Sequence, residues 1–115
     1  MCGVYIIEYA GDLDTVASSD RWLVKDARDG KYIGFSTRQS ALKYAYTTLK
    51  KKYSDRAKRR GTILGLLSIY DMNTRSKSRP FSPSYWIGWR DNDPVIRDRQ
   101  DNILRLYATG KTKLI

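Results

Sequence analysis

The sequence predicts a single α+β domain spanning residues 1–115, with an antiparallel sheet of about six or seven short strands and one long amphipathic helix packed on one face. The length of 115 residues fits one domain. Hydrophobic residues make up 41% of the chain and aromatic residues 12%, which is enough to fill one core. Short β-branched and aromatic runs, separated by turn residues, flank a single long stretch with helical periodicity.

Three strands are expected before the helix. Residues 3–9 are β-branched and aromatic and predict a first strand, which we place at the centre of the sheet. The small and acidic residues 10–20 predict a loop. Residues 21–26 and 31–35 predict two further strands, joined by a hairpin turn at 29–30 because glycine accepts the positive φ that such turns need.

The clearest element is the helix that follows Ser36. Ser36 and Gln39 fit a capping box, in which the Gln39 side chain reaches back to the backbone N–H of Ser36. The helix is expected to end between Tyr53 and Arg60, with Gly61 as its stop. Its apolar stripe consists of Leu42, Ala45, Tyr46, Leu49 and Tyr53. The arc away from that stripe carries Lys43, Lys50, Lys51 and Lys58.

The second half of the chain predicts more strands. Residues 62–70 are apolar on both alternating sets, which indicates a strand covered on both faces, with a short helix as the alternative. Residues 71–84 are polar, basic and rich in Ser and Pro, and predict a flexible loop or arm. Residues 85–90 predict a strand and 91–94 a turn. A closing hairpin is expected from strands at 95–99 and 102–108.

Composition excludes several classes of function. The chain has no histidine and one cysteine, Cys2, so Cys/His zinc sites, disulfide frameworks and histidine-based triads are ruled out. Aspartates cluster at 12–20 and 91–101, but turn chemistry explains them better than a Mg²⁺-dependent nuclease does. We therefore expect a binding protein and no enzyme, with no cofactor and no metal. No segment approaches the ~20 apolar residues of a spanning helix, so we expect no membrane partner. The N-terminus does not resemble a signal peptide and Cys2 is the only cysteine, so we expect a cytoplasmic location, the host cytoplasm if the protein is phage-encoded.

The formal charge of +10 is unevenly distributed. Residues 1–35 hold four basic and six acidic side chains, a net charge of −2. Residues 36–60 hold nine basic side chains and one acidic side chain, a net charge of +8. Such a concentration predicts a polyanionic partner, because each Lys or Arg near a phosphate releases counterions. The plainer alternative is a solvated helix face that keeps the protein soluble.

The motifs GVY, RWLVKD and DGKYIGFSTRQSALKYAY, within residues 3–53, resemble the AP2-type DNA-binding module and its relatives in phage integrases and homing nucleases. The resemblance implies three strands followed by one helix, with the strands facing the DNA groove. On matching positions it implies DNA contacts by Arg21, Trp22, Lys25 and Lys31. The sequence departs from that pattern in the acidic insertion at 10–20 and in the net charge of −2 over residues 1–35.

The leading hypothesis is a small basic protein that binds nucleic acid, DNA or RNA, mainly through the phosphate backbone. Trp86 and Arg90 share one face of the strand at 85–90 and are candidates for stacking unpaired bases. The alternatives for Trp86 are an anchor in a protein interface and, as the plainer interpretation, a ring half-buried at the rim of the sheet. The complete set of candidate binding residues is Lys43, Lys50, Lys51, Lys52, Arg56, Lys58, Arg59, Arg60, Arg75, Lys77, Arg79, Trp86 and Arg90.

The alternative hypothesis is a small phage-type inhibitor or adaptor, of the anti-CRISPR, anti-restriction or transcription-inhibitor kind. Such a protein would dock on a host complex that processes nucleic acid. It rests on size and composition alone. The sequence leaves the oligomeric state open.

Overall fold

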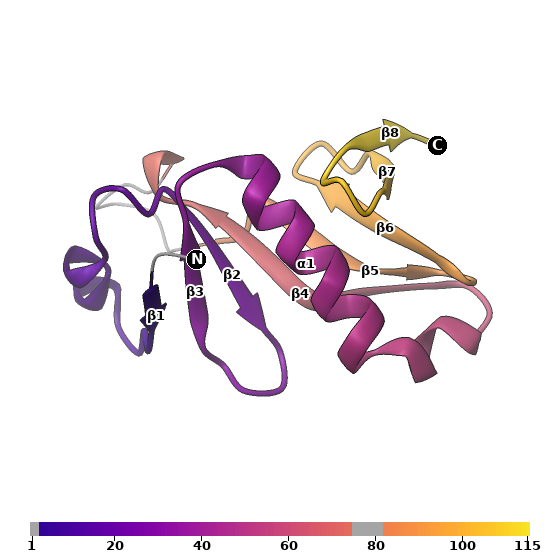
Figure 1. The fold of residues 1–115 in the computed structure, drawn as a ribbon, viewed down its shortest axis with the longest axis horizontal. Coiled ribbons are helices and arrows are strands. Elements are labelled where there is room, and N and C mark those ends of the chain that lie inside the picture. Colours follow the sequence, from indigo (N-terminus) through magenta and orange to yellow (C-terminus); the bar gives the residue numbers. More distant parts are fainter. Residues whose placement is uncertain (1–2, 75–81) are drawn as a thin grey trace.

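The structure, a computed structural model, describes residues 3–74 and 82–115. In these residues one α-helix, α1 (Arg38–Lys52), lies against one antiparallel sheet of eight strands (Figure 1). The strands are β1 (Gly3–Tyr5), β2 (Trp22–Asp26), β3 (Tyr32–Phe35), β4 (Thr62–Asp71), β5 (Tyr85–Arg90), β6 (Asp93–Asp98), β7 (Ile103–Leu106) and β8 (Thr112–Leu114). Their order across the sheet is β1-β3-β2-β4-β5-β6-β7-β8. The predicted α+β class is confirmed, although the sheet has more strands than the six or seven expected.

The unpredicted strand is β8. It pairs antiparallel with β7 after a turn at Gly110, whose φ is +83°. The turn packs on α1, because a β-carbon at Gly110 would approach the Gln39 carbonyl oxygen to 2.6 Å. Only a residue without a side chain fits there, so the turn between β7 and β8 lies against the first half of the helix.

The first strand lies at the edge of the sheet, and its predicted central position is wrong. β1 pairs only with β3 among the described residues, and it ends at Tyr5 where we expected it to continue to residue 9. Val4 and Ile6 are 57% and 70% exposed, although their residue types are typical of a buried strand. The reason is topological: β2 is paired with β3 on one side and β4 on the other, so β1 can add only outside β3. Part of the loop expected at 10–20 is a short 3₁₀ helix, η1 (Ala10–Thr15).

The face of the sheet that meets α1 forms the main core. Val24 is paired with Ile33 and Ile69, and residues paired across strands share a face. The buried side chains of this core are Trp22, Val24, Phe35, Ala41, Leu42, Ala45, Leu49, Tyr53, Leu67, Ile69, Ile87, Trp89, Ile96 and Leu106. The predicted helix stripe is confirmed, except that Tyr46 is only partly buried.

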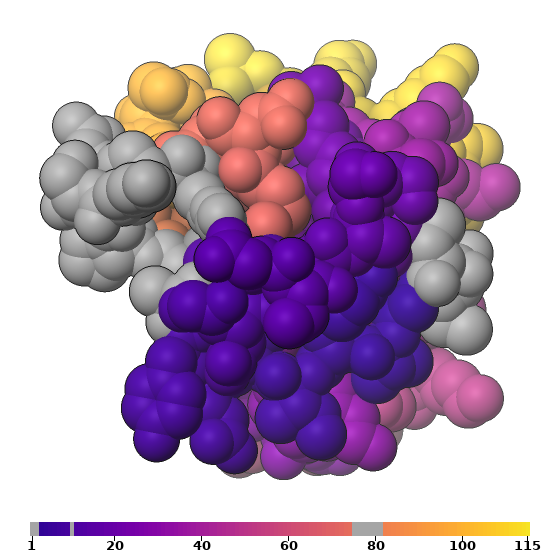
Figure 2. All heavy atoms as spheres, turned by 90° about the vertical axis from the view of Figure 1, so that its left-hand side faces the viewer, coloured from indigo at the N-terminus to yellow at the C-terminus, as the bar shows by residue number. Residues whose placement is uncertain are grey.

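A second, smaller cluster covers part of the opposite face. Leu23, Tyr32 and Tyr70 are its buried members, and Tyr5, Ile7, Val16 and Met72 pack against them. Figure 2 shows this end of the molecule, over which the N-terminal segment (indigo) is spread. The segment is tied down by the Tyr5 hydroxyl, which donates a 2.6 Å hydrogen bond to the buried Asp20 carboxylate.

The helix begins one residue later than the capping box predicts. Thr37 is the N-cap, and its Oγ1 accepts a hydrogen bond from the Ser40 backbone N–H. The Gln39 side chain does not reach back to Ser36 and instead donates to the Thr109 carbonyl oxygen at 3.0 Å. The helix ends at Lys52, before the expected range, and Ser54–Lys58 form the 3₁₀ helix η2.

The strand expected at 62–70 is confirmed as β4, and the helical alternative is wrong. A bulge between Ile63 and Leu67 uses Gly65, whose φ is +86°. The bulge brings the Ile63 carbonyl against Gly88, where a β-carbon would stand 1.7 Å from the oxygen. Only the C-terminal half of β4 is buried on both faces; Leu67 and Ile69 join the main core and Tyr70 joins the second cluster.

The remaining connections differ in detail from those expected. Asp71 completes β4 and Met72–Thr74 form the 3₁₀ helix η3; residues 75–81 of the predicted arm lie outside the described residues. The turn expected at 91–94 is shorter, because β6 already begins at Asp93. The closing hairpin is confirmed as β6 and β7.

Candidate nucleic-acid interface

Basic side chains gather where the chain leaves α1. The helix ends at Lys52, η2 follows at once, and Gly61, with φ of +89°, turns the chain into β4. We call the cations of this corner the helix-exit cluster: Lys50, Lys51, Arg56, Lys58, Arg59 and Arg60. Cations at the C-terminal end of a helix also complement its dipole, but one or two charges suffice for that purpose.

Lys52 has a structural role and is not part of this cluster. Its Nζ lies 3.0 Å from Asp26 Oδ2 and 3.8 Å from Asp29 Oδ2. The Tyr53 hydroxyl donates a short hydrogen bond to the other oxygen of Asp26. The end of α1 is thereby tied to the β2–β3 hairpin, and the charge of Lys52 is already compensated.

The pKa values of these groups report the same network. Burial raises the pKa of Asp26, but the hydrogen bonds from Tyr53, the Arg28 backbone and Lys52 outweigh burial and hold it below its usual range. The hydrogen bond to Asp26 raises the pKa of Lys52. Burial and the bond to Asp26 raise the pKa of Tyr53 to about 12.

The rest of the corner is anchored through Trp89. This ring is 2% exposed, and its Nε1 donates to the Tyr53 carbonyl oxygen at 3.0 Å. The ammonium group of Lys50 lies 5.7 Å from the ring centroid of Tyr46 and 5.9 Å from that of Trp89. Lys50 therefore contacts two aromatic rings while its side chain remains exposed.

Four members of the cluster are exposed and have neither an ion pair nor a cation–π contact with any residue that the structure describes. They are Lys51, Lys58, Arg59 and Arg60. Arg56 is half-buried, and its Nε has no hydrogen-bond partner within the described ranges. The cluster thus presents uncompensated positive charge from a short, continuous stretch of chain.

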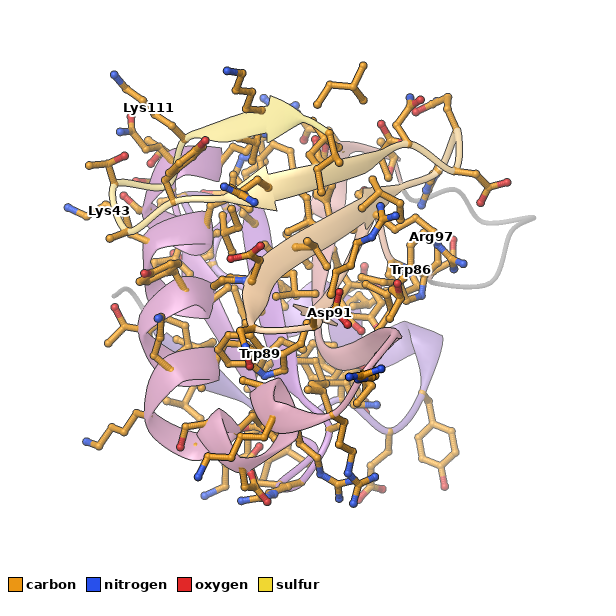
Figure 3. All side chains as sticks on the ribbon, turned by 90° about the vertical axis from the view of Figure 1, so that its right-hand side faces the viewer. Lys43, Trp86, Trp89, Asp91, Arg97 and Lys111 are labelled. Atoms are coloured by element: carbon orange, nitrogen blue, oxygen red, sulfur yellow. The ribbon has the colours of Figure 1, made fainter. Side chains whose placement is uncertain are left out.

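The cluster borders an open pocket of about 420 Å³, lined by Lys58, Arg59, Arg60, Asp91 and Asn92. Two hydrogen bonds fix its walls to each other: the Gly61 N–H donates to Asp91 Oδ1 at 2.9 Å, and the Asp91 N–H donates to the Gly61 carbonyl at 2.9 Å. Figure 3 looks at this end of the molecule, with Asp91 on the turn between β5 and β6.

Three further predicted side chains lie outside the cluster. Lys43 packs against Gly110, where a β-carbon would approach Lys43 Cγ to 3.0 Å, and it lies on the same side of the molecule as Lys111 (Figure 3). Trp86 is half-buried on the face away from α1, and the Arg97 guanidinium lies 4.6 Å from its ring centroid. Arg90 is exposed and precedes Asp91 at the end of β5. Arg75, Lys77 and Arg79 lie outside the described residues.

Asp91 and Asn92 are not among the residues expected at the site. The only signal in the sequence is a turn, DNDP, which follows Arg90. Their place beside Gly61 depends on the pairing of β4 with β5, in which Thr62 is opposite Arg90. A contact between residues 30 positions apart has no local signature.

The positions implied by the AP2-like resemblance are dispersed. Trp22 is buried in the main core, and Arg21 donates two hydrogen bonds to Asp71 at 3.1 and 3.2 Å. Lys25 lies 5.5 Å from the ring centroid of Tyr32, on the face away from α1. Lys31 is exposed at the β2–β3 hairpin.

Fold and site together define a small α+β domain with one strongly basic corner. Comparison with models of protein families, with curated protein sequences and with solved structures gives no significant match. None of the helices in residues 3–74 and 82–115 is long and apolar enough to cross a membrane. Over the same ranges, no three acidic or thiol side chains are grouped as metal ligands would be.

Proposed function

We propose that the protein binds nucleic acid through the helix-exit cluster, mainly by contacts to the phosphate backbone, and that it acts by binding alone. The observation that carries the proposal is the set of four exposed cations, Lys51, Lys58, Arg59 and Arg60, for which the described residues supply neither an ionic partner nor an aromatic ring. The phosphates of a nucleic-acid strand are a polyanion that such a set of cations can bind.

The surroundings of the cluster support this proposal. Lys52 is bound to Asp26, and Trp89 is bonded to the backbone of Tyr53, so the segment that carries the four cations is fixed at its beginning. The hydrogen bonds between Gly61 and Asp91 fix it at its end. A segment whose backbone is already fixed at both ends loses less conformational freedom on binding than a free loop does.

The test compares two variants that lose equal charge. The cluster variant carries Lys51→Gln, Lys58→Gln, Arg59→Gln and Arg60→Gln. The control variant carries Lys25→Gln, Lys43→Gln, Lys111→Gln and Lys113→Gln. Lys25 lies on the face of the sheet away from α1, Lys43 and Lys111 lie beside Gly110, and Lys113 is in β8. Fluorescence anisotropy with labelled single- and double-stranded oligonucleotides should show the cluster variant weakened on the order of tenfold or more, and the control variant much less.

Equal weakening of both variants would mean that net charge, and not the cluster, governs binding. If the wild-type protein binds no oligonucleotide but retains a protein partner from a nuclease-treated extract, the alternative of an inhibitor or adaptor is favoured instead.

A further inference from the structure

The pocket beside the helix-exit cluster has a mixed chemistry that phosphate alone does not explain. Three of its lining residues, Lys58, Arg59 and Arg60, are cations that suit a phosphate. Asp91 is a carboxylate and would repel that phosphate. A ligand that fits all of these groups carries both an anion and hydrogen-bond donors.

One oxygen of Asp91 is used by the fold and the other is available. Oδ1 accepts the hydrogen bond from the Gly61 N–H at 2.9 Å, which fixes the carboxylate in orientation. No other side-chain hydrogen bond or ion pair joins Asp91 to a residue within the described ranges. Asp91 is exposed and lines the pocket.

A nucleotide with an unpaired base meets both requirements. Its phosphate matches the three cations, and an exocyclic amino group on its base matches the free carboxylate oxygen, as when an acidic side chain accepts a hydrogen bond from cytosine N4. The pocket is open and its lining is polar and charged, and its volume of about 420 Å³ is large enough for one nucleotide. A paired cytosine still exposes one N4 hydrogen in the major groove, but a stacked base cannot enter a pocket together with its own phosphate, so the ligand is single-stranded or has an unpaired end.

We propose that Asp91 makes this pocket a site for an unpaired base and that it favours cytosine over uracil. This inference rests on the proposed function, because the phosphate of the same nucleotide is held by the helix-exit cluster. It goes beyond the proposed function because it assigns a base preference to a surface that otherwise contacts only the phosphate backbone.

The test uses oligodeoxynucleotides of about eight residues, a usual site size, made only of deoxycytidine or only of deoxyuridine. Cytosine carries an amino donor at position 4 and an acceptor at N3. Uracil carries a carbonyl oxygen at position 4, and its N3–H lies between two carbonyl oxygens that repel a carboxylate. The wild-type protein should bind the cytosine oligonucleotide roughly five- to tenfold more tightly at pH near 7.5. Asp91→Asn replaces the acceptor with an amide donor and should abolish or reverse that ratio.

Asp101→Asn is the matched control. Asp101 is also an exposed aspartate with positive φ, 64°, on a hairpin turn, but it lies between β6 and β7 and does not line the pocket. Both substitutions remove one negative charge, and asparagine tolerates positive φ as well as aspartate does. Asp101→Asn should therefore leave the cytosine-to-uracil ratio unchanged.

Two results would overturn the inference: equal affinity of the wild-type protein for both oligonucleotides, or a ratio that survives Asp91→Asn. Either result leaves salt-dependent binding through the cluster intact. Failure of the wild-type protein to bind any oligonucleotide would overturn the proposed function as well, so the two failures are distinguishable.

Discussion

Asp26 is the residue on which the placement of the basic corner depends. Asp26 is 7% exposed, and its carboxylate accepts hydrogen bonds from Tyr53, Lys52 and the backbone of Arg28. These contacts join β2 to the end of α1 across 26 and 27 positions of sequence. Nothing in the local sequence marks Asp26 for this role, since an aspartate before a turn is ordinarily explained by the turn itself.

Asp26→Asn should lower the free energy of unfolding by roughly 1–3 kcal/mol near neutral pH, because the hydrogen bonds to a buried charged acceptor are weakened. Urea denaturation measures the difference. Asp29→Asn is the control, since Asp29 is exposed and its oxygen is 3.8 Å from Lys52; its effect should stay below about 0.5 kcal/mol. Equal effects of the two substitutions would contradict the assigned role of Asp26.

The same network gives stability a defined pH dependence. The pKa of Asp26 is lowered in the folded state, so its contribution is present above the ordinary value of 3.8 and is lost as pH falls through the folded-state pKa. The pKa values of Lys52 and Tyr53 are raised, the latter to about 12, so their contributions are lost as pH rises from about 10 toward 12. The stability difference between wild type and Asp26→Asn, measured by urea denaturation across pH, should therefore shrink below about pH 4. A difference that does not change between pH 6 and pH 3 would contradict this assignment.

At the scale of elements, periodicity predicts the helix and most of the strands, but not their ends. Ser36 and Thr37 are both good N-cap residues, so sequence alone does not choose between them. The choice is made by tertiary structure, because Gln39, the partner that a cap at Ser36 needs, is hydrogen-bonded to Thr109. The sequence correctly predicts strands at β2, β3, β4, β5 and β6, because successive residues in them point to opposite faces of the sheet and both sets are largely apolar.

Thr37→Ala should destabilise the protein by ~1 kcal/mol, since it removes the side chain that caps the Ser40 N–H. Ser36→Ala should change stability by no more than a few tenths of a kcal/mol on the usual scale of exposed substitutions. Thermal unfolding of the two variants measures the difference in stability and so shows which residue caps the helix. A larger loss for Ser36→Ala would restore the capping box that the sequence predicts.

Gly88→Ala tests the crossing of the β4 bulge over β5. The added β-carbon would stand 1.7 Å from the Ile63 carbonyl oxygen, so the backbone must move, at a cost of roughly 1–3 kcal/mol or more. Gly11→Ala is the control, because nothing lies within 4 Å of a β-carbon there. Urea denaturation should show a large loss for the first variant and almost none for the second. Equal stability of the two would contradict the bulge.

At the scale of the whole molecule, contiguous features are predictable and long-range ones are not. The helix-exit cluster is visible in the sequence because its members follow one another from residue 50 to residue 60. Helical periodicity predicts one face that carries Lys43, Lys50, Lys51 and Lys58. In the structure α1 ends at Lys52, so Lys58 lies on η2, and Lys43 lies apart from the cluster, beside Gly110. The edge position of β1 and the approach of Asp91 to Gly61 arise from strand order, which local patterns do not encode.

The salt dependence of nucleic-acid binding tests the central claim most directly. For each phosphate contact, the slope of log K against log salt concentration changes by about 0.9 on B-DNA and about 0.7 on single strands. We predict a steep negative slope for the wild-type protein, which the cluster variant at Lys51, Lys58, Arg59 and Arg60 reduces by about 3 and the control variant reduces by less than about 1. A flat wild-type response, or the same slope in the wild-type protein and the cluster variant, would contradict the account.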